Sequence, residues 1–309
     1  MRIAVTGSGG RLGGALVRAI TAAPAAAALE VVAWGRAELD LDAPTGIDRL
    51  VEVSGVDVVV HAAAWTDVDG CALDPELALR RNGVATGILA AATARRGIDL
   101  IALSTNEVFD GSGPAGRPHE PADRPYEPAD PPSPANAYGA SKLAGERLAA
   151  AAYARRGSRG RFGIVRTAWL FGPGRPDFPV KIALAARRAI AAGEPLRLVA
   201  DEIGTPTFVE DVAGAILGLV QAGAVGGVHH VVNGGMASRA EWGRDVVGRL
   251  GLDVEVEEVS LADFPRPSRP PRWGVLAATP VPGGRVLRPW PQAMAAYLPA
   301  LRESVTMAR

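Results

Sequence analysis

Two observations in the sequence predict an α/β fold built on a doubly wound parallel sheet. Short apolar segments alternate with longer helical patterns over roughly the first 170 residues, and this alternation is typical of parallel strands connected by helices. The short segments are largely apolar throughout, without strict alternation with polar residues. Strands have this composition when helices cover both faces of their sheet.

Each element follows from its local pattern. Strands are expected at 1–6, 31–34, 56–61, 100–104 and 162–166, and helices at 12–23, 77–95 and 141–153. Residues 114–134 contain eight prolines, which exclude a helix or a central strand. We therefore expect a long loop there, of the kind that serves as a lid or a binding loop. A second proline-rich break is expected at 264–273.

Charge and cysteine content exclude several classes of protein. The 309 residues carry 33 basic and 33 acidic side chains and have no net charge, so there is no field to attract nucleic acid or an anionic membrane. The single cysteine, Cys71, cannot form an internal disulfide, and we expect a cytoplasmic protein. We expect neither a secretory leader nor a transmembrane segment.

A glycine-rich turn separates the first strand from the first helix. Gly7, Gly10 and Gly13 have the spacing G-x-x-G-x-x-G. Such glycines allow a tight turn, close approach of the backbone to a pyrophosphate, and close packing of the helix on the strand. The helix N-terminus then offers free N–H groups to the phosphates. The sequence thus predicts a Rossmann-type dinucleotide-binding domain.

The end of the second strand indicates which dinucleotide binds. It reads Trp34-Gly35-Arg36 and has no carboxylate for the ribose hydroxyls. Arg36 can pair with a 2′-phosphate, so we expect NADPH, with NADH possible; the alternative for Arg36 is a solvated side chain. Asp40 and Leu41 follow, near the adenine or in a solvated turn.

Tyr138 and Lys142 form a candidate proton relay. At positions i and i+4 they share one helix face. A nearby ammonium is expected to lower the pKa of the tyrosine, which can then exchange a proton with a carbonyl as hydride is transferred. Thr105 follows the strand at 100–104, at the sheet edge where such folds bind ligands.

These segments resemble the extended short-chain dehydrogenases/reductases and, more narrowly, the dTDP-4-dehydrorhamnose reductase family. The resemblance covers residues 1 to about 290. It is carried by residues 7–13, 61–69, 82, 104–111, 136–146, 166–172 and 204–207, and by Arg269-Pro270 with Leu276.

The resemblance implies a role for each matching residue. Thr105, Tyr138 and Lys142 would be catalytic. The cofactor would lie along Gly10, Arg11, Leu12, Asp40, Leu41, Ala63, Ala64 and Thr66. The substrate, a 4-keto deoxysugar nucleotide, would meet Val68, Asn106, Glu107 and Trp169, with Arg269 on its diphosphate.

The resemblance also implies a domain division and an assembly. A dinucleotide-binding domain would comprise residues 1–172, with 207–233 returning to it. A smaller C-terminal α/β domain, of residues 173–206 and 234–309, would bind the substrate. A homodimer is possible. Some relatives bind magnesium through glutamates at a dimer interface; Ala15 stands at one such position, so no metal is expected there.

Several positions depart from the family pattern. Where the family usually reads Ser-Thr-Asp-Tyr-Val-Phe, this chain has Asn106 and Glu107. Both would face the substrate, and the added carboxylate could change or exclude the usual sugar. His61 stands where asparagine is common, and Trp273 replaces a small polar residue.

Three functions therefore stay open at this point. The first is NADPH-dependent reduction of a 4-keto deoxysugar nucleotide. The second is the same chemistry on another keto substrate. The third is a non-catalytic NADP-binding subunit that resembles the regulatory subunit of methionine adenosyltransferase.

Overall fold

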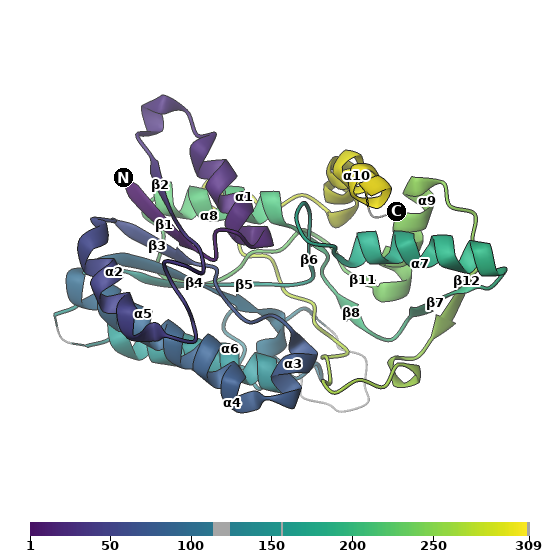
Figure 1. Ribbon diagram of the computed structural model, residues 1–309, viewed down its shortest axis with the longest axis horizontal. Helices are drawn as coiled ribbons and strands as arrows, with labels where there is room; N and C mark the ends of the chain where they lie inside the picture. The colour runs from purple at the N-terminus through teal and green to yellow at the C-terminus, as the bar shows by residue number, and fades with distance from the viewer. Residues whose placement is uncertain (114–123, 156, 308–309) are drawn as a thin grey trace.

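The computed structural model describes residues 1–113, 124–155 and 157–307. Within these residues a six-stranded sheet has the order β10-β5-β4-β3-β1-β2, and all its neighbouring strands are parallel (Figure 1). Its strands are β1 (Arg2–Thr6), β2 (Glu30–Trp34), β3 (Val58–His61), β4 (Asp99–Thr105), β5 (Phe162–Thr167) and β10 (Gly227–His230). The carboxyl ends of β1, β3 and β4 lie next to one another, which is where a ligand meets such a sheet.

Helices cover both faces of this sheet. α1 (Arg11–Thr21) and α8 (Val209–Gln221) pack on one face, around a core that includes Ile3 and Val5. α2 (Ile47–Ser54), α5 (Ala85–Arg96) and α6 (Ala137–Tyr153) cover the other face, around a core that includes Ala4 and Val59 (Figure 1). Successive residues of β1 thus enter different cores, and the predicted doubly wound sheet is confirmed.

The predicted helix at 77–95 is part of a longer helical segment that changes its winding. α4 (Pro75–Ala78) leads into η3 (Leu79–Val84), a π-helical stretch, and then into α5. The wider turn places the buried side chain of Asn82 against neighbouring elements. Asn82 accepts a hydrogen bond from the Trp65 amide (2.8 Å) and donates to the Ser141 hydroxyl of α6 (3.0 Å). Irregular helical turns of this kind often occur at functional sites.

The C-terminal lobe has its own core and its own small sheets. Its helices are α7 (Phe178–Ala192), α9 (Arg239–Leu250) and α10 (Trp290–Met307). β7 (Leu196–Val199) pairs with β12 (Val256–Val259), and β8 (Ile203–Gly204) pairs with β11 (Ala237–Ser238). The core includes the buried side chains of Trp242, Tyr297 and Leu301. β6 (Leu170–Phe171) pairs with β9 (Thr207–Phe208) between this lobe and the sheet (Figure 1).

Short helical turns complete the described chain. They are α3 (Val68–Leu73), η1 (Ala25–Ala27), η2 (Pro44–Gly46), η4 (Asn106–Val108) and η5 (Leu261–Asp263). No helix in the described ranges has both the length and the apolar composition needed to cross a membrane.

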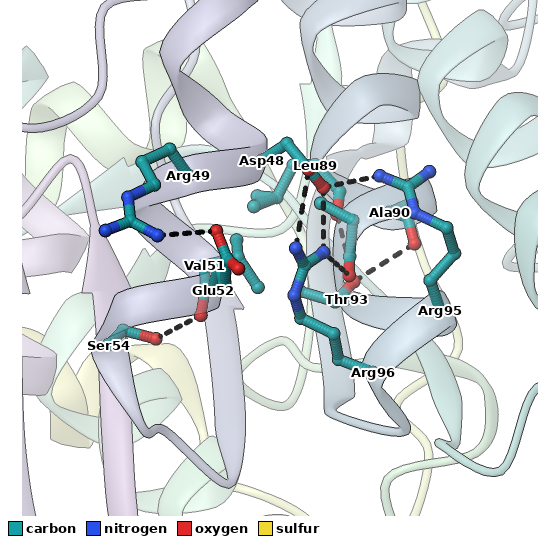
Figure 2. A network of polar contacts seen from close by, with 11 residues as sticks. Asp48, Arg49, Val51, Glu52, Ser54, Leu89, Ala90, Thr93, Arg95 and Arg96 are labelled. Atoms are coloured by element: carbon teal, nitrogen blue, oxygen red, sulfur yellow. Dashed lines mark hydrogen bonds and ion pairs between the residues drawn. The ribbon is translucent and has the colours of Figure 1, made fainter.

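Surface charges join α2 to the end of α5. Asp48, in the first turn of α2, accepts hydrogen bonds from Arg95 and Arg96 (Figure 2). These bonds lower the pKa of Asp48 to about 2. In the same network the Thr93 hydroxyl donates to backbone carbonyl oxygens of its own helix.

The proline-rich segments are irregular where the structure describes them. Residues 114–123 of the predicted loop lie outside the described residues, and residues 124–136 contain no helix and only an isolated bridge between Tyr126 and Leu276. Residues 264–273 lack regular structure and end beside the C-terminal lobe, where the Ile203 amide donates to the Arg272 carbonyl (2.7 Å).

Candidate active site

A cavity of about 460 Å³ lies between the sheet and the C-terminal lobe. The wall includes thirteen of the residues expected from the sequence. They are Gly10, Arg11, Leu12, Gly13, Ala64, Thr66, Val68, Thr105, Asn106, Glu107, Tyr138, Lys142 and Trp169. The expected residues Gly7, Arg36, Asp40, Leu41, Ala63 and Arg269 are not among those that line it.

The glycine turn has the geometry that a bound dinucleotide needs. Gly7 has a φ of +62°, and a Cβ there would lie 2.8 Å from the Ala63 Cα. A Cβ on Gly13 would lie 2.1 Å from the Gly7 carbonyl oxygen. Gly10 precedes α1 and offers no side-chain cap, so the first N–H groups of the helix are available to phosphate oxygens.

The backbone N–H of Arg11 belongs to the free N-terminus of α1, whereas its side chain bonds the C-terminal lobe. Its guanidinium donates to the carbonyl oxygens of Gly172 and Arg175 and lies 3.4 Å from the Asp177 carboxylate. Arg11 thus ties the glycine turn to the start of α7, and both Nη atoms are engaged with protein acceptors.

Arg36 lies at the surface beyond β2. Its side chain is 79% exposed and lies within 4 Å of two carboxylates, those of Asp40 and Asp42. Of the expected cofactor residues in this region, Arg36 is exposed, whereas Asp40 and Leu41 are partly buried, and none of the three lines the cavity.

Thr105, Tyr138 and Lys142 line the cavity beside the carboxyl end of β4. The Thr105 hydroxyl oxygen accepts the Glu107 amide (3.1 Å) and so caps η4. The Asn136 side chain accepts the Gly139 amide (2.8 Å) and caps α6, which carries the other two residues. The Tyr138 hydroxyl hydrogen-bonds with Thr105.

Burial dominates the electrostatics of this group. It raises the pKa of Tyr138 above its ordinary value, and the nearby Glu107 carboxylate raises it further. Burial lowers the pKa of Lys142 to about 8. The net shift of the Tyr138 pKa is therefore upward, opposite in direction to the lowering expected from Lys142, because loss of hydration and a carboxylate both disfavour the phenolate.

The two residues that depart from the family pattern occupy different places on the wall. Glu107 accepts a hydrogen bond from the Asn136 side chain through Oε2 (2.7 Å), and burial raises its pKa. Asn106 is buried and packs closely against Gly274. The wall is therefore acidic beside Thr105 and Tyr138.

The end of the cavity beside Trp169 contains a residue that the sequence analysis missed. Arg239, at the start of α9, lines the cavity with its guanidinium 3.5 Å from the centroid of the Trp169 ring. Trp169 has a φ of +41°, an uncommon value for a bulky residue. The sequence offers one signal for this position: Ser238-x-x-Glu241 is a capping-box motif, which places Arg239 in the first turn of a helix.

Arg269, which the sequence analysis expected at the substrate, is not among the residues that line the cavity. Its side chain is exposed, and its carbonyl oxygen accepts a hydrogen bond from Asn136 (3.1 Å). Its backbone therefore meets the N-terminus of α6 while its guanidinium lies off the cavity wall.

Ala15, the position at which the sequence analysis expected no metal, lies in α1. Ala15 is fully buried in the sheet core. Among the residues that the structure describes, no three histidine, cysteine or carboxylate side chains form a group able to hold a metal ion.

The fold and the cavity together define an NAD(P)-dependent oxidoreductase with a Rossmann-type sheet. The family model for the RmlD substrate binding domain matches residues 1–303. The chain belongs to this family, which confirms the predicted resemblance.

Relatives and solved structures agree with this assignment. The chain is 37% identical to the dTDP-4-dehydrorhamnose reductase of Mycobacterium tuberculosis, over 100% of this chain and 96% of the relative. It is 34% identical to that of Streptomyces griseus, over 96% and 93%. The crystal structure of a dTDP-4-dehydrorhamnose reductase from Clostridium acetobutylicum superposes with a TM-score of 0.86 at 28% identity, covering 98% of this chain and all of that one. The Bacillus anthracis reductase in complex with NADP has a TM-score of 0.82 at 26% identity, covering 97% and 99%.

Proposed function

We propose that this protein reduces the 4-keto group of a deoxysugar nucleotide with NADPH. The observation that carries the proposal is the meeting of Thr105, Tyr138 and Lys142 in a cavity that continues to the glycine turn. The relatives named dTDP-4-dehydrorhamnose reductase, one of them solved with NADP, support the same reaction.

The residues present fit a dinucleotide. The uncapped N-terminus of α1 would hold the pyrophosphate, and exposed Arg36 would pair with a 2′-phosphate. Lys142 would bind the nicotinamide ribose. The bound cofactor supplies the hydride.

The chain itself supplies the proton and the orientation. Thr105 Oγ1 accepts the Glu107 amide. Its own proton is directed to Asn106 Oδ1 at 3.4 Å and would turn to the carbonyl oxygen of a bound substrate. Tyr138 donates the proton to the carbonyl oxygen as hydride arrives at the carbon. Burial and Glu107 keep the Tyr138 phenol protonated, which suits a donor in the direction of reduction.

Glu107 bears on which sugar is reduced. A carboxylate on the wall accepts hydrogen bonds and repels negative charge. The same chemistry on a keto sugar other than 4-dehydrorhamnose is therefore the second candidate, and this observation favours it.

The decisive experiment follows NADPH oxidation with dTDP-4-dehydro-L-rhamnose. We expect turnover by the wild type and a loss of about 10²–10⁴-fold in kcat for Tyr138→Phe, with NADPH binding retained. Tyr153→Phe is the matched control, because Tyr153 lies on the same helix but bonds Thr93 and the Ile98 carbonyl outside the cavity. Equal rates for wild type and Tyr138→Phe would exclude the proposed acid.

A wild type that binds NADPH without turning over this substrate would direct the search to other keto sugars. If the protein reduces none of these keto sugars, and a pull-down recovers a methionine adenosyltransferase in stoichiometric amount, the protein would instead be a non-catalytic NADP-binding subunit.

We also propose a cytoplasmic location, which the buried, unpaired Cys71 supports. A homodimer is a further expectation. Size-exclusion chromatography with light scattering tests the assembly.

A further inference from the structure

Arg239 is held rigidly on the cavity wall. Its Nε and Nη2 donate to Glu202 Oε1 (3.2 and 2.8 Å), and its backbone N–H donates to the Glu202 carbonyl oxygen (3.2 Å). The guanidinium also stacks on the Trp169 indole. The Ser238–Glu241 capping box fixes the helix start from which the side chain extends. Because Glu202 is itself buried, this arrangement orients the cation before a ligand binds.

One edge of this guanidinium is available to a ligand. Within the described residues, Nη1 of Arg239 has no hydrogen-bond partner. The described wall carries two other cationic side chains, Arg11 and Lys142. Arg11 is engaged with protein acceptors of the C-terminal lobe, and Lys142 lies at the catalytic group. Arg239 is thus the wall cation that can meet an anion at the substrate end.

We infer that Arg239 binds the diphosphate of the substrate, a role that rests on the proposed sugar-nucleotide reductase function. A guanidinium forms parallel hydrogen bonds to phosphate oxygens. Glu202 and Trp169 hold one edge and one face of the guanidinium, and the Nη1 edge meets the phosphate. The sequence analysis gave this role to Arg269, whose side chain is exposed and is not among the residues that line the cavity.

The test compares the binding of dTDP and dTMP by titration calorimetry, which needs no turnover. We expect the wild type to bind dTDP at least about tenfold more tightly than dTMP, since charged hydrogen bonds to the second phosphate are lost in dTMP. Arg239→Met should remove most of this preference. The matched variant Arg269→Met should keep it within about twofold.

Steady-state kinetics give an independent measurement. Arg239→Met should raise the KM for the sugar nucleotide about tenfold or more, with the KM for NADPH within about twofold of the wild type. If Arg239→Met does not fold, Arg239→Lys is the alternative variant. Lysine keeps the positive charge but cannot form two parallel hydrogen bonds to a phosphate, so this variant should lose part of the dTDP preference.

Several outcomes would overturn the inference. They are a wild type with no preference for dTDP over dTMP, an Arg239 variant that keeps the preference, and a loss of preference in Arg269→Met. A raised KM for the sugar nucleotide with an unchanged dTDP preference would place Arg239 on the sugar and refute its role on the diphosphate. Failure of turnover with an intact, Arg239-dependent dTDP preference would refute only the proposed reductase function.

Discussion

At the scale of single residues, the chemistry depends on how burial changes protonation. Thr105 and Lys142 are each less than 10% exposed. Burial penalises the charged forms of both Tyr138 and Lys142. The tyrosine therefore keeps its proton, while the lysine titrates closer to neutral pH than an exposed lysine does.

Lys142 provides a direct test at this scale. The sequence has two lysines, Lys142 and Lys181, so the ε-methylene groups should give two resolvable NMR signals. We expect the Lys142 signal to titrate near pH 8, because burial lowers its pKa to about 8. The variant Lys181→Arg removes the signal of an exposed lysine and assigns the other. A Lys142 signal that does not change until above about pH 10, the range of an ordinary lysine, would contradict the expected effect of burial.

At the scale of elements, the site depends on a close contact between η4 and the N-terminus of α6. A Cβ on Gly139 would lie 1.9 Å from the Glu107 carbonyl oxygen. Asn136 bonds both the Glu107 side chain and the Gly139 amide. This contact sets the position of Tyr138 relative to Thr105.

Gly139→Ala should therefore damage both stability and activity. The added methyl group must move backbone, at a cost of about 1–3 kcal/mol, and the movement displaces Tyr138. Urea unfolding and kcat/KM measure the two effects.

Gly214→Ala is the control for that substitution. Gly214 is an exposed residue of α8, and a Cβ added there would have no neighbouring atom within 4 Å. Alanine there should stabilise the protein by about 0.5–1 kcal/mol through helix propensity. Equal stability and activity of the two alanine variants would show that the η4–α6 contact is unimportant.

At the scale of the whole molecule, separate hydrophobic cores lie on the two sides of the cavity. We propose the domain division given by residues 1–172 with 207–233, and 173–206 with 234–309. The core that includes Val209 and Val231 on the sheet side, and the separate core around Trp242, support it. Phe171 and Phe208 pack in the second core, so two of the three crossings between domains, at 172/173 and 206/207, lie close to these residues.

The buried side chain of His61, at the end of β3, makes the free energy of unfolding depend on pH. Its Nδ1 lies 2.8 Å from the Thr6 hydroxyl and its Nε2 lies 3.0 Å from the Thr86 hydroxyl. Thr86 donates its own proton to the Asn82 carbonyl (2.7 Å), so Nε2 is the protonated nitrogen of a neutral ring. Burial and Lys142 lower the pKa of His61 to about 3.

Acid should therefore destabilise the fold. Since the folded pKa lies below the unfolded value of about 6.5, the contribution of His61 to stability is full above about pH 6.5 and falls as the pH approaches about 3. His61 alone should cost about 3 kcal/mol by about pH 4. The measurement is the free energy of unfolding in urea between about pH 7 and pH 4.

The variant His61→Asn isolates this contribution. It should show a shallower loss of stability with acid, with a remaining slope because burial also lowers the pKa of His230 to about 4. His229→Asn, at a partly exposed position of β10, is the control. An unchanged pH dependence in His61→Asn would refute the role of His61.

Features encoded by local patterns could be predicted from the sequence. The strands, the glycine turn and the placement of Thr105, Tyr138 and Lys142 depend on residues near one another in the chain. In the structure, Thr105, Tyr138, Lys142 and the Gly10 end of the glycine turn line one cavity. The π-helical turn at Asn82 was not predicted, because its periodicity differs little from that of an ordinary helix over so few residues.

The sequence by itself thus determined the fold class, the dinucleotide turn and the residues proposed to be catalytic, because each has a periodic or closely spaced signal. Only the tertiary structure decided that Arg239 lines the cavity and is held there by Glu202, that Arg269 is not among the lining residues, and that the pKa of Tyr138 is raised. These properties arise from burial and from interactions between residues far apart in the chain, such as Arg11 with Asp177 and Glu107 with Arg239. No local pattern records which distant side chains share a cavity, and the dielectric environment of that cavity sets the protonation on which its chemistry depends.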